Sequence, residues 1–143
     1  MKTRTLTLAA ALSLSLGAVL PAHANEFFVN QLGFGNAVGG VQSGTGNVVG
    51  THQEGLFNGA TARQNGHGNV GAVGQIGVLN DADLDQAGIH NAAGVAQFGA
   101  NHQAVMSQDG AGNVAAAVQV GDGCSGGVNQ HGAGNVAAIV QAC

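Results

Sequence analysis

The sequence predicts an all-β fold, a two-sheet β-solenoid with cross-β stacking in which each coil takes 22 residues and holds two strands. Three features of the 143-residue chain predict it. Glutamine recurs every eleven residues, glycine stands two residues after nearly every glutamine, and asparagine stands five residues after most of them. An internal repeat kept this strictly is the sequence signature of a solenoid.

Residues 1–24 precede the repeats and have the pattern of a secretory signal peptide. Lys2 and Arg4 give a basic start, residues 6–20 are mostly apolar, and residues 22–24 form a small-residue cleavage site. The apolar segment is shorter than the about 20 residues that cross a bilayer. We therefore expect cleavage after Ala24, and a single repeat domain at 25–143 that is secreted to the extracellular space or cell surface and has no membrane span.

The composition excludes several classes of partner. The whole chain has a net charge of −4, and removal of Lys2 and Arg4 leaves −6 on residues 25–143. Without a basic patch, nucleic acid and anionic lipid are poor partners. Trp and Tyr are absent, and Gly, Ala and Val dominate. A chain with so few large side chains is either disordered or stabilised by backbone pairing, and the strict spacing favours pairing.

Neither an α-helical coiled coil nor a collagen triple helix fits this chain. An eleven-residue repeat also produces right-handed coiled coils, but each glycine costs about 1 kcal/mol in a helix interior, and every repeat contains glycine. Collagen requires glycine at every third position, which this chain lacks.

Each repeat is predicted to form a seven-residue strand from Asn to Gln, followed by a four-residue turn in which Gly and Asn supply positive φ. In residues 135–141, alternation places Asn135, Ala137, Ile139 and Gln141 on the inner side of the strand, and the residues between them on the outer side. The same alternation fits residues 25–31 at the start of the domain.

The fixed spacing is explained by hydrogen bonding between identical amides. A buried amide is costly unless it is hydrogen-bonded, and amides stacked in register about 4.8 Å apart donate to one neighbour and accept from the other. The predicted glutamine ladder comprises Gln31, Gln42, Gln53, Gln64, Gln75, Gln86, Gln97, Gln108, Gln119, Gln130 and Gln141. The predicted asparagine ladder comprises Asn36, Asn47, Asn58, Asn69, Asn80, Asn91, Asn113 and Asn135, with His102 and Cys124 in the two remaining positions.

The repeat Gln-x-Gly-x-x-Asn-x-Ala-x-x-x-Gln resembles the curlin repeat, the unit of the bacterial functional amyloid curli. It reads "QAGIHNAAGVAQ" at 86–97 and "QDGAGNVAAAVQ" at 108–119, and the resemblance covers residues 25–143. It implies an extracellular fibre or pilus subunit that is secreted unfolded, polymerises with itself, and contributes to cell adhesion and biofilm matrix. A nucleator subunit and outer-membrane secretion machinery are the further partners it implies.

Differences from the family bear on subunit type and export. The family's nucleator has basic residues near its C-terminus, and this chain has none there, which favours a major-type subunit. The family's major subunit has a targeting segment before its repeats, whereas "NEFFVNQ" at 25–31 already fits a strand, so the export route stays open. Eleven predicted strands is an odd number, so a head-to-tail stack must rotate alternate subunits or leave one strand outside the solenoid.

The two sheets are predicted to have outer faces of different character. One face is polar and carries Asp81, Asp83 and Asp85, which we expect to restrain assembly because outward charges on a strand slow edge-to-edge pairing. Arg63 precedes Asp85 by 22 residues and is expected to stack beside it. The other face is flat and apolar, as at interaction surfaces, and its candidate lateral-contact residues are Val48, Val70, Val114, Val118, Val136 and Val140. The plain alternatives are a solvated acidic surface and small residues that merely suit a flat sheet.

Cys124 and Cys143 are candidates for a disulfide, because two cysteines pair readily in an oxidising compartment. Stacking places Cys143 beside Gly121, only a few residues from Cys124, so a bond across the final coil is reasonable. A disulfide between subunits and free thiols are the alternatives.

We expect no enzyme, cofactor or metal. The histidines are scattered without a recurring geometry, and no nucleophile, base and acid occur together. The chief alternative function is a monomeric secreted solenoid that binds ice or polysaccharide on its flat face. Ranks of threonine or exposed aromatic residues would favour that function, and the chain has few of either.

Overall fold

The computed structural model describes residues 24–143, which form eleven strands in two parallel sheets. The predicted signal peptide lies outside the described residues, apart from Ala24. What we call the odd sheet has six strands in the order β1-β3-β5-β7-β9-β11, and the even sheet has five in the order β2-β4-β6-β8-β10. The strands are β1 (Glu26–Phe34), β2 (Ala37–Thr45), β3 (Val48–Leu56), β4 (Gly59–His67), β5 (Val70–Val78), β6 (Asp81–Ile89), β7 (Ala92–Ala100), β8 (Gln103–Ala111), β9 (Val114–Asp122), β10 (Ser125–Ala133) and β11 (Val136–Ala142).

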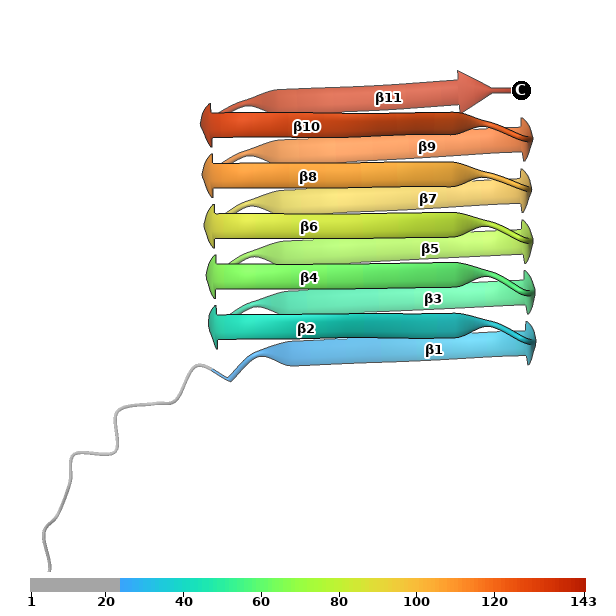
Figure 1. The fold of residues 1–143 in the computed structure, drawn as a ribbon, viewed down its shortest axis with the longest axis horizontal. Coiled ribbons are helices and arrows are strands. Elements are labelled where there is room, and N and C mark those ends of the chain that lie inside the picture. The colour runs from blue at the N-terminus through green and yellow to red at the C-terminus, as the bar shows by residue number, and fades with distance from the viewer. Residues whose placement is uncertain (1–23) are drawn as a thin grey trace, which may run out of the picture.

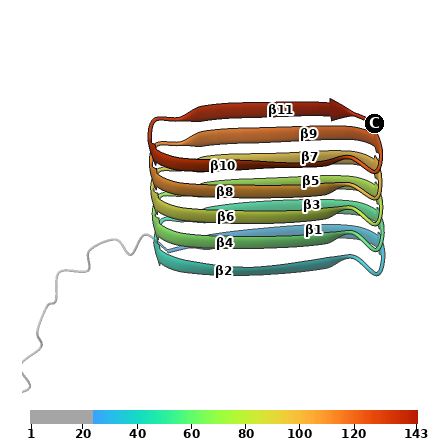
Figure 2. The ribbon, with the colours of Figure 1, turned by 45° about the horizontal axis from the view of Figure 1, so that its top comes forward.

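Successive strands alternate between the sheets, so the chain rises steadily from β1 to β11 (Figure 1). Each strand pairs in parallel with the strand one coil away, in a register of 22 residues. Gln53 pairs with Gln75, for example, and Gln86 with Gln108. Figure 2 shows the two sheets as separate layers joined at both ends of the strands. The predicted two-sheet β-solenoid with 22-residue coils is therefore confirmed.

The strands are longer than the predicted seven residues. Strands β1 to β10 each contain nine residues, beginning after the Asn position and ending three residues beyond Gln, so that two residues separate successive strands. Pairing continues through the glycine that follows Gln by two positions, as between Gly55 and Gly77. Each corner of the coil is therefore partly a bend within a paired strand, and the predicted four-residue turn is wrong.

Glycine is required at this bend by both conformation and space. Gly77 has a φ of 135°, and a Cβ added there would overlap the carbonyl oxygen of Gly99 in the next coil. The second positive φ of each corner occurs four residues after Gln, where most repeats have glycine, and where Phe57, Leu79, His90 and Asn101 adopt it in the others. The asparagines of the predicted ladder do not have positive φ. Their predicted role in the turn conformation is therefore wrong.

Small apolar side chains fill most of the space between the sheets. The buried core consists of Val49, Ala60, Ala62, Val73, Ala82, Leu84, Ala93, Val95, Ala104, Met106, Ala115, Ala117 and Val128. Larger residues are accommodated where glycine leaves room. A Cβ on Gly71 would overlap the Leu84 side chain, and a Cβ on Gly40 would overlap the ring of Phe27.

Residues 24–143 include no helix with the length and apolar character needed to cross a membrane.

The bend glycines provide a direct test of the fold. We expect Gly77→Ala to lower the free energy of unfolding by at least about 1–3 kcal/mol, because alanine must adopt a strained φ and its methyl group displaces the next coil. Gly94→Ala is the control, since a Cβ there meets no atom within 4 Å. Urea unfolding of the dilute, unassembled chain measures both, and equal midpoints for the two variants would contradict the prediction.

Candidate functional site

Glutamine side chains form a continuous hydrogen-bonded column on the inner face of each sheet. The Nε2 of each glutamine donates to the Oε1 of the glutamine 22 residues later, at 2.7–2.9 Å. The odd-sheet column contains Gln31, Gln53, Gln75, Gln97, Gln119 and Gln141, and the even-sheet column contains Gln42, Gln64, Gln86, Gln108 and Gln130. From Gln53 to Gln119 these side chains are buried, so the amides bond to one another in place of water.

The second N–H of each glutamine amide joins the two sheets. Gln97 Nε2 donates to the carbonyl oxygen of Asp81, the first residue of the preceding strand, at 2.9 Å. The same bond spans 16 residues in every repeat from Gln42 to Gln141. Sequence reasoning did not identify this bond, because it depends on where the facing strand begins. Each internal glutamine therefore fixes both the coil spacing and the distance between sheets.

The asparagine columns run in the opposite direction. Asn69 Nδ2 donates back to Asn47 Oδ1 at 3.0 Å, and the backbone N–H of Asn69 donates to the same oxygen at 3.1 Å. Asn69 Nδ2 also donates to the Gly88 carbonyl at 3.0 Å. The asparagine oxygen thus satisfies a backbone N–H just before the strand ladder begins, where a carbonyl partner is missing. Within residues 24–143, Thr51 Oγ1 is the one buried side-chain polar atom without a partner.

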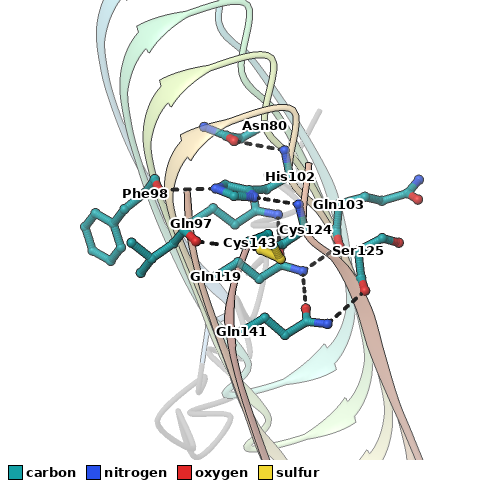
Figure 3. The surroundings of a disulfide bond; sticks show 11 residues. Asn80, Gln97, Phe98, His102, Gln103, Gln119, Cys124, Ser125, Gln141 and Cys143 are labelled. Carbon is teal, nitrogen blue, oxygen red and sulfur yellow. Dashed lines mark hydrogen bonds between the residues drawn. A yellow bond between two sulfur atoms is a disulfide. The ribbon is translucent and has the colours of Figure 1, made fainter. Parts of the chain in front are cut away.

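His102 occupies an asparagine position and reproduces three of its hydrogen bonds to the neighbouring coils and to its own strand end (Figure 3). The His102 N–H donates to Asn80 Oδ1 at 3.2 Å, and His102 Nδ1 accepts from the Cys124 N–H at 3.1 Å. Because a backbone N–H can only donate, Nδ1 carries no proton. The Nε2 then carries the proton and donates to the Phe98 carbonyl oxygen at 3.2 Å. A neutral imidazole therefore replaces a carboxamide in the column.

Cys124 occupies the next position of this column and is bonded to Cys143, 19 residues later (Figure 3). Their Cα atoms are 5.6 Å apart, and Cys143 stands where other repeats have the bend glycine. Of the three cysteine states that the sequence left open, the structure has the intrachain disulfide. The bond closes the last coil at the C-terminal end of the solenoid.

The predicted polar face lies on the even sheet. Asp81, Asp83 and Asp85 point outward from β6, which is the central strand of that sheet. Arg63 is in register with Asp85, but its Nη1 bonds Asp83 Oδ1 at 3.1 Å. The expected stacking of Arg63 beside Asp85 is therefore confirmed, whereas the ion pair is formed with Asp83, because the long arginine side chain reaches diagonally to the neighbouring carboxylate.

The predicted apolar face lies on the odd sheet and is wider than expected. Its six valines are all at least partly exposed, and Val136 and Val140 are each 78% exposed. The three extra residues of each strand add an exposed apolar row that the prediction had assigned to turns, comprising Leu32, Ile76, Phe98 and Val120. Between the valines, Gly50, Ala72, Gly94 and Ala116 line two shallow depressions.

Both ends of the solenoid expose unpaired strands with complementary amide groups. At the lower end, formed by β1 and β2, Gln31 Oε1 and Gln42 Oε1 accept no hydrogen bond from the described residues. At the upper end, formed by β10 and β11, Gln130 and Gln141 each use one amide N–H and retain the other. The inward Phe27 and Val29 of β1 are 37% and 48% exposed. In the glutamine columns the lower end therefore presents acceptors and the upper end presents donors, and the acceptors of the lower end lie beside uncovered apolar side chains.

The described residues contain no group of three or more His, Cys, Asp or Glu side chains placed to hold a metal ion.

Comparison with known proteins identifies the repeats. The sequence model of the curlin associated repeat matches residues 58–88 and 80–110. The two matches are offset by 22 residues, the length of one coil. The chain therefore contains curlin repeats, as its resemblance to that family predicted. No curated protein and no solved structure matches the chain significantly.

A central rung of the glutamine column can be tested by removing its amide. We expect Gln97→Met to lower the free energy of unfolding by about 1–3 kcal/mol for each group left unpaired, because Gln75 loses an acceptor and Gln119 loses a donor. Gln103→Met is the matched control, since Gln103 points outward from β8 and is exposed. Urea unfolding measures both variants, and similar losses would show that the column contributes no specific stability.

Proposed function

We propose that this chain is the structural subunit of an extracellular, curli-like amyloid fibre and that it assembles by adding strands at the two open ends of its solenoid. The single observation that supports this most strongly is that the vacant glutamine acceptors at the lower end complement the retained glutamine donors at the upper end. Unprotected strand edges template further pairing, and a solenoid without polar terminal caps extends by stacking.

Assembly extends the same interactions that hold the monomer together. Inside the solenoid every coil gains backbone pairing and amide bonds from the coils on both sides, whereas each terminal coil gains them from one side only. A second copy supplies the missing partners for Phe27, Val29 and the terminal glutamines. We therefore propose that the fibre is a homopolymer and that assembly itself is the biological activity, without a catalytic or cofactor-dependent step.

The cellular role follows from the curlin repeats and the sequence of residues 1–24. We propose that the chain is secreted after cleavage of this segment, that it forms the bulk of a surface fibre, and that the fibre contributes to adhesion and biofilm matrix. A major-type role is favoured over a nucleator role by the absence of basic residues near the C-terminus. A separate nucleator and outer-membrane secretion machinery are its proposed partners.

The experiment is assembly of the purified chain without its signal segment. We expect fibres by electron microscopy, binding of amyloid dyes, and a meridional reflection near about 4.8 Å in fibre diffraction. A chain that stays a folded monomer at high concentration would overturn the proposal and favour a ligand-binding solenoid. Thr51 is buried rather than presented on the flat face, which counts against ice binding.

The aspartate cluster is proposed to slow the start of assembly. Asp81, Asp83 and Asp85 lie on β6, the central strand of the even sheet. Their charges are therefore proposed to repel one another and other strands at the stage when β6 has not yet paired with its neighbours. We expect conversion of all three to Asn to shorten the lag before dye fluorescence rises. Conversion of Glu54, Asp109 and Asp122 to their amides removes the same charge elsewhere and serves as the control. An equal effect of both triple variants would assign the lag to net charge.

The apolar face of the odd sheet is proposed to hold neighbouring filaments side by side. Val70 and Val118 lie on β5 and β9, away from both ends. We expect Val70→Asp with Val118→Asp to leave single filaments intact and to disperse bundles, because charge on each filament would face charge on the next. Thr61→Asp with Val105→Asp places the same charge on the even face as a control. Bundles that persist in the first variant would exclude this surface.

A further inference from the structure

We propose that successive subunits of the fibre are related by a half-turn about the fibre axis, so that β1 of an incoming copy pairs with β10 and its β2 pairs with β11. This inference rests on the proposed fibre and specifies how two copies join. Four independent features of the two ends support it: strand parity, the amide groups, the inward side chains, and the outward side chains.

A ladder of strands that continues across the junction between two copies requires the half-turn. Residues 24–143 form an odd number of strands, so the first and the last strand of this described part both belong to the odd sheet. The vacant place at the upper end is therefore in the even sheet, above β10. An incoming copy without rotation would put β1 above β11 and leave one strand missing between β10 and the incoming β2. A half-turn instead fills each vacancy in order.

The amide columns then continue without interruption on both sides. The eleven-residue repeat aligns Gln130 with the incoming Gln31, and Gln141 with the incoming Gln42. The retained N–H groups of the upper end meet the vacant oxygens of the lower end. Asn135 Oδ1 likewise faces the N–H groups of the incoming Asn36, as Asn113 Oδ1 faces those of Asn135 within the chain.

The inward side chains fit together in this register because each large residue meets a glycine. Phe27 of the incoming copy lies over Gly126, and Gly40 of that copy lies over Ile139. The two remaining pairs are Val29 over Val128 and Val38 over Ala137. Without the half-turn, Phe27 would instead lie over Ala137, and Val29 over Ile139. In the rotated register Phe27, the largest inward side chain of the lower end, therefore stacks on a residue that has no side chain of its own.

The outward side chains show the same match. The odd face is apolar along most of its length, but its first strand presents Glu26 and Asn30 on either side of the exposed Phe28. The even face is polar along most of its length, but its first strand, β2, presents Ala37, Gly39 and Val41. A half-turn places β1 in line with the polar face and β2 in line with the apolar face. Strand β2 thus has the apolar character of the opposite sheet, and β1 is polar at two of the three outward positions before Gln31, which suits a rotated partner.

In this register Asn30 pairs with Asn129, Glu26 with Ser125, and Val41 with Val140. Without rotation, Glu26 and Asn30 would lie over Val136 and Val140. The corner formed by Cys124 and Cys143 is the one part of the upper end that does not continue a column, since a disulfide replaces the asparagine amide there.

Cysteine cross-linking distinguishes the two arrangements. Paired residues on adjacent strands lie about 4.8 Å apart, within the Cα separation of a disulfide. The variant Asn30→Cys with Asn129→Cys, assembled into fibres and oxidised, is expected to give covalent multimers on a denaturing gel, with the pair identified by peptide mass spectrometry. The variant Asn30→Cys with Val140→Cys is the comparison and is expected to stay monomeric. All three positions are exposed, so neither variant disturbs the core.

Each outcome decides a separate point. Fibres linked through positions 30 and 129 support the half-turn. Fibres linked through 30 and 140, or through neither pair, overturn the half-turn while leaving the fibre proposal standing. Failure of the unaltered chain to form fibres overturns both proposals. As a second measurement, electron cryo-microscopy is expected to give an axial rise of about 26 Å per subunit with a half-turn between neighbours, against about 29 Å without rotation.

Discussion

The structure depends on a requirement of buried carboxamides, which must have hydrogen-bond partners once they leave water. In this chain the glutamine amides find those partners in identical residues one coil away and in a carbonyl of the opposite sheet. The first bond sets the axial spacing, and the second sets the distance between the sheets. Both bonds require the same residue at the same interval along the chain. Repetition in the sequence is therefore a consequence of how these amides are satisfied.

The substitutions in the asparagine column define what that position requires. Asn69 and His102 both supply an acceptor for the backbone N–H one coil above, and a donor for a backbone carbonyl. Cys124 supplies neither in this way, and within residues 24–143 no further coil stacks above it in this column. The column thus tolerates chemical change as long as the acceptor for the next coil is kept.

Much of the fold could be predicted because its information is periodic. Identical spacing of Gln53, Gln75 and Gln97 gives the coil length, and alternation gives the inner side of each strand. The extent of the strands could not be predicted, since Gly77 in sequence resembles a turn glycine, whereas in the structure it is a bend held in the ladder. The bond from Gln97 to Asp81 and the diagonal pairing of Arg63 with Asp83 depend on positions in the facing or neighbouring strand. These relations have no signal within a single repeat.

The opposed directions of the two kinds of amide column have a consequence for long filaments. Glutamine amides donate toward the C-terminal end of the solenoid and asparagine amides toward the N-terminal end, so their dipoles oppose one another along the axis. Sheets already have small net dipoles because their backbone groups largely cancel. A polymer of many such molecules therefore accumulates little electric polarisation along its axis from these side chains as it lengthens.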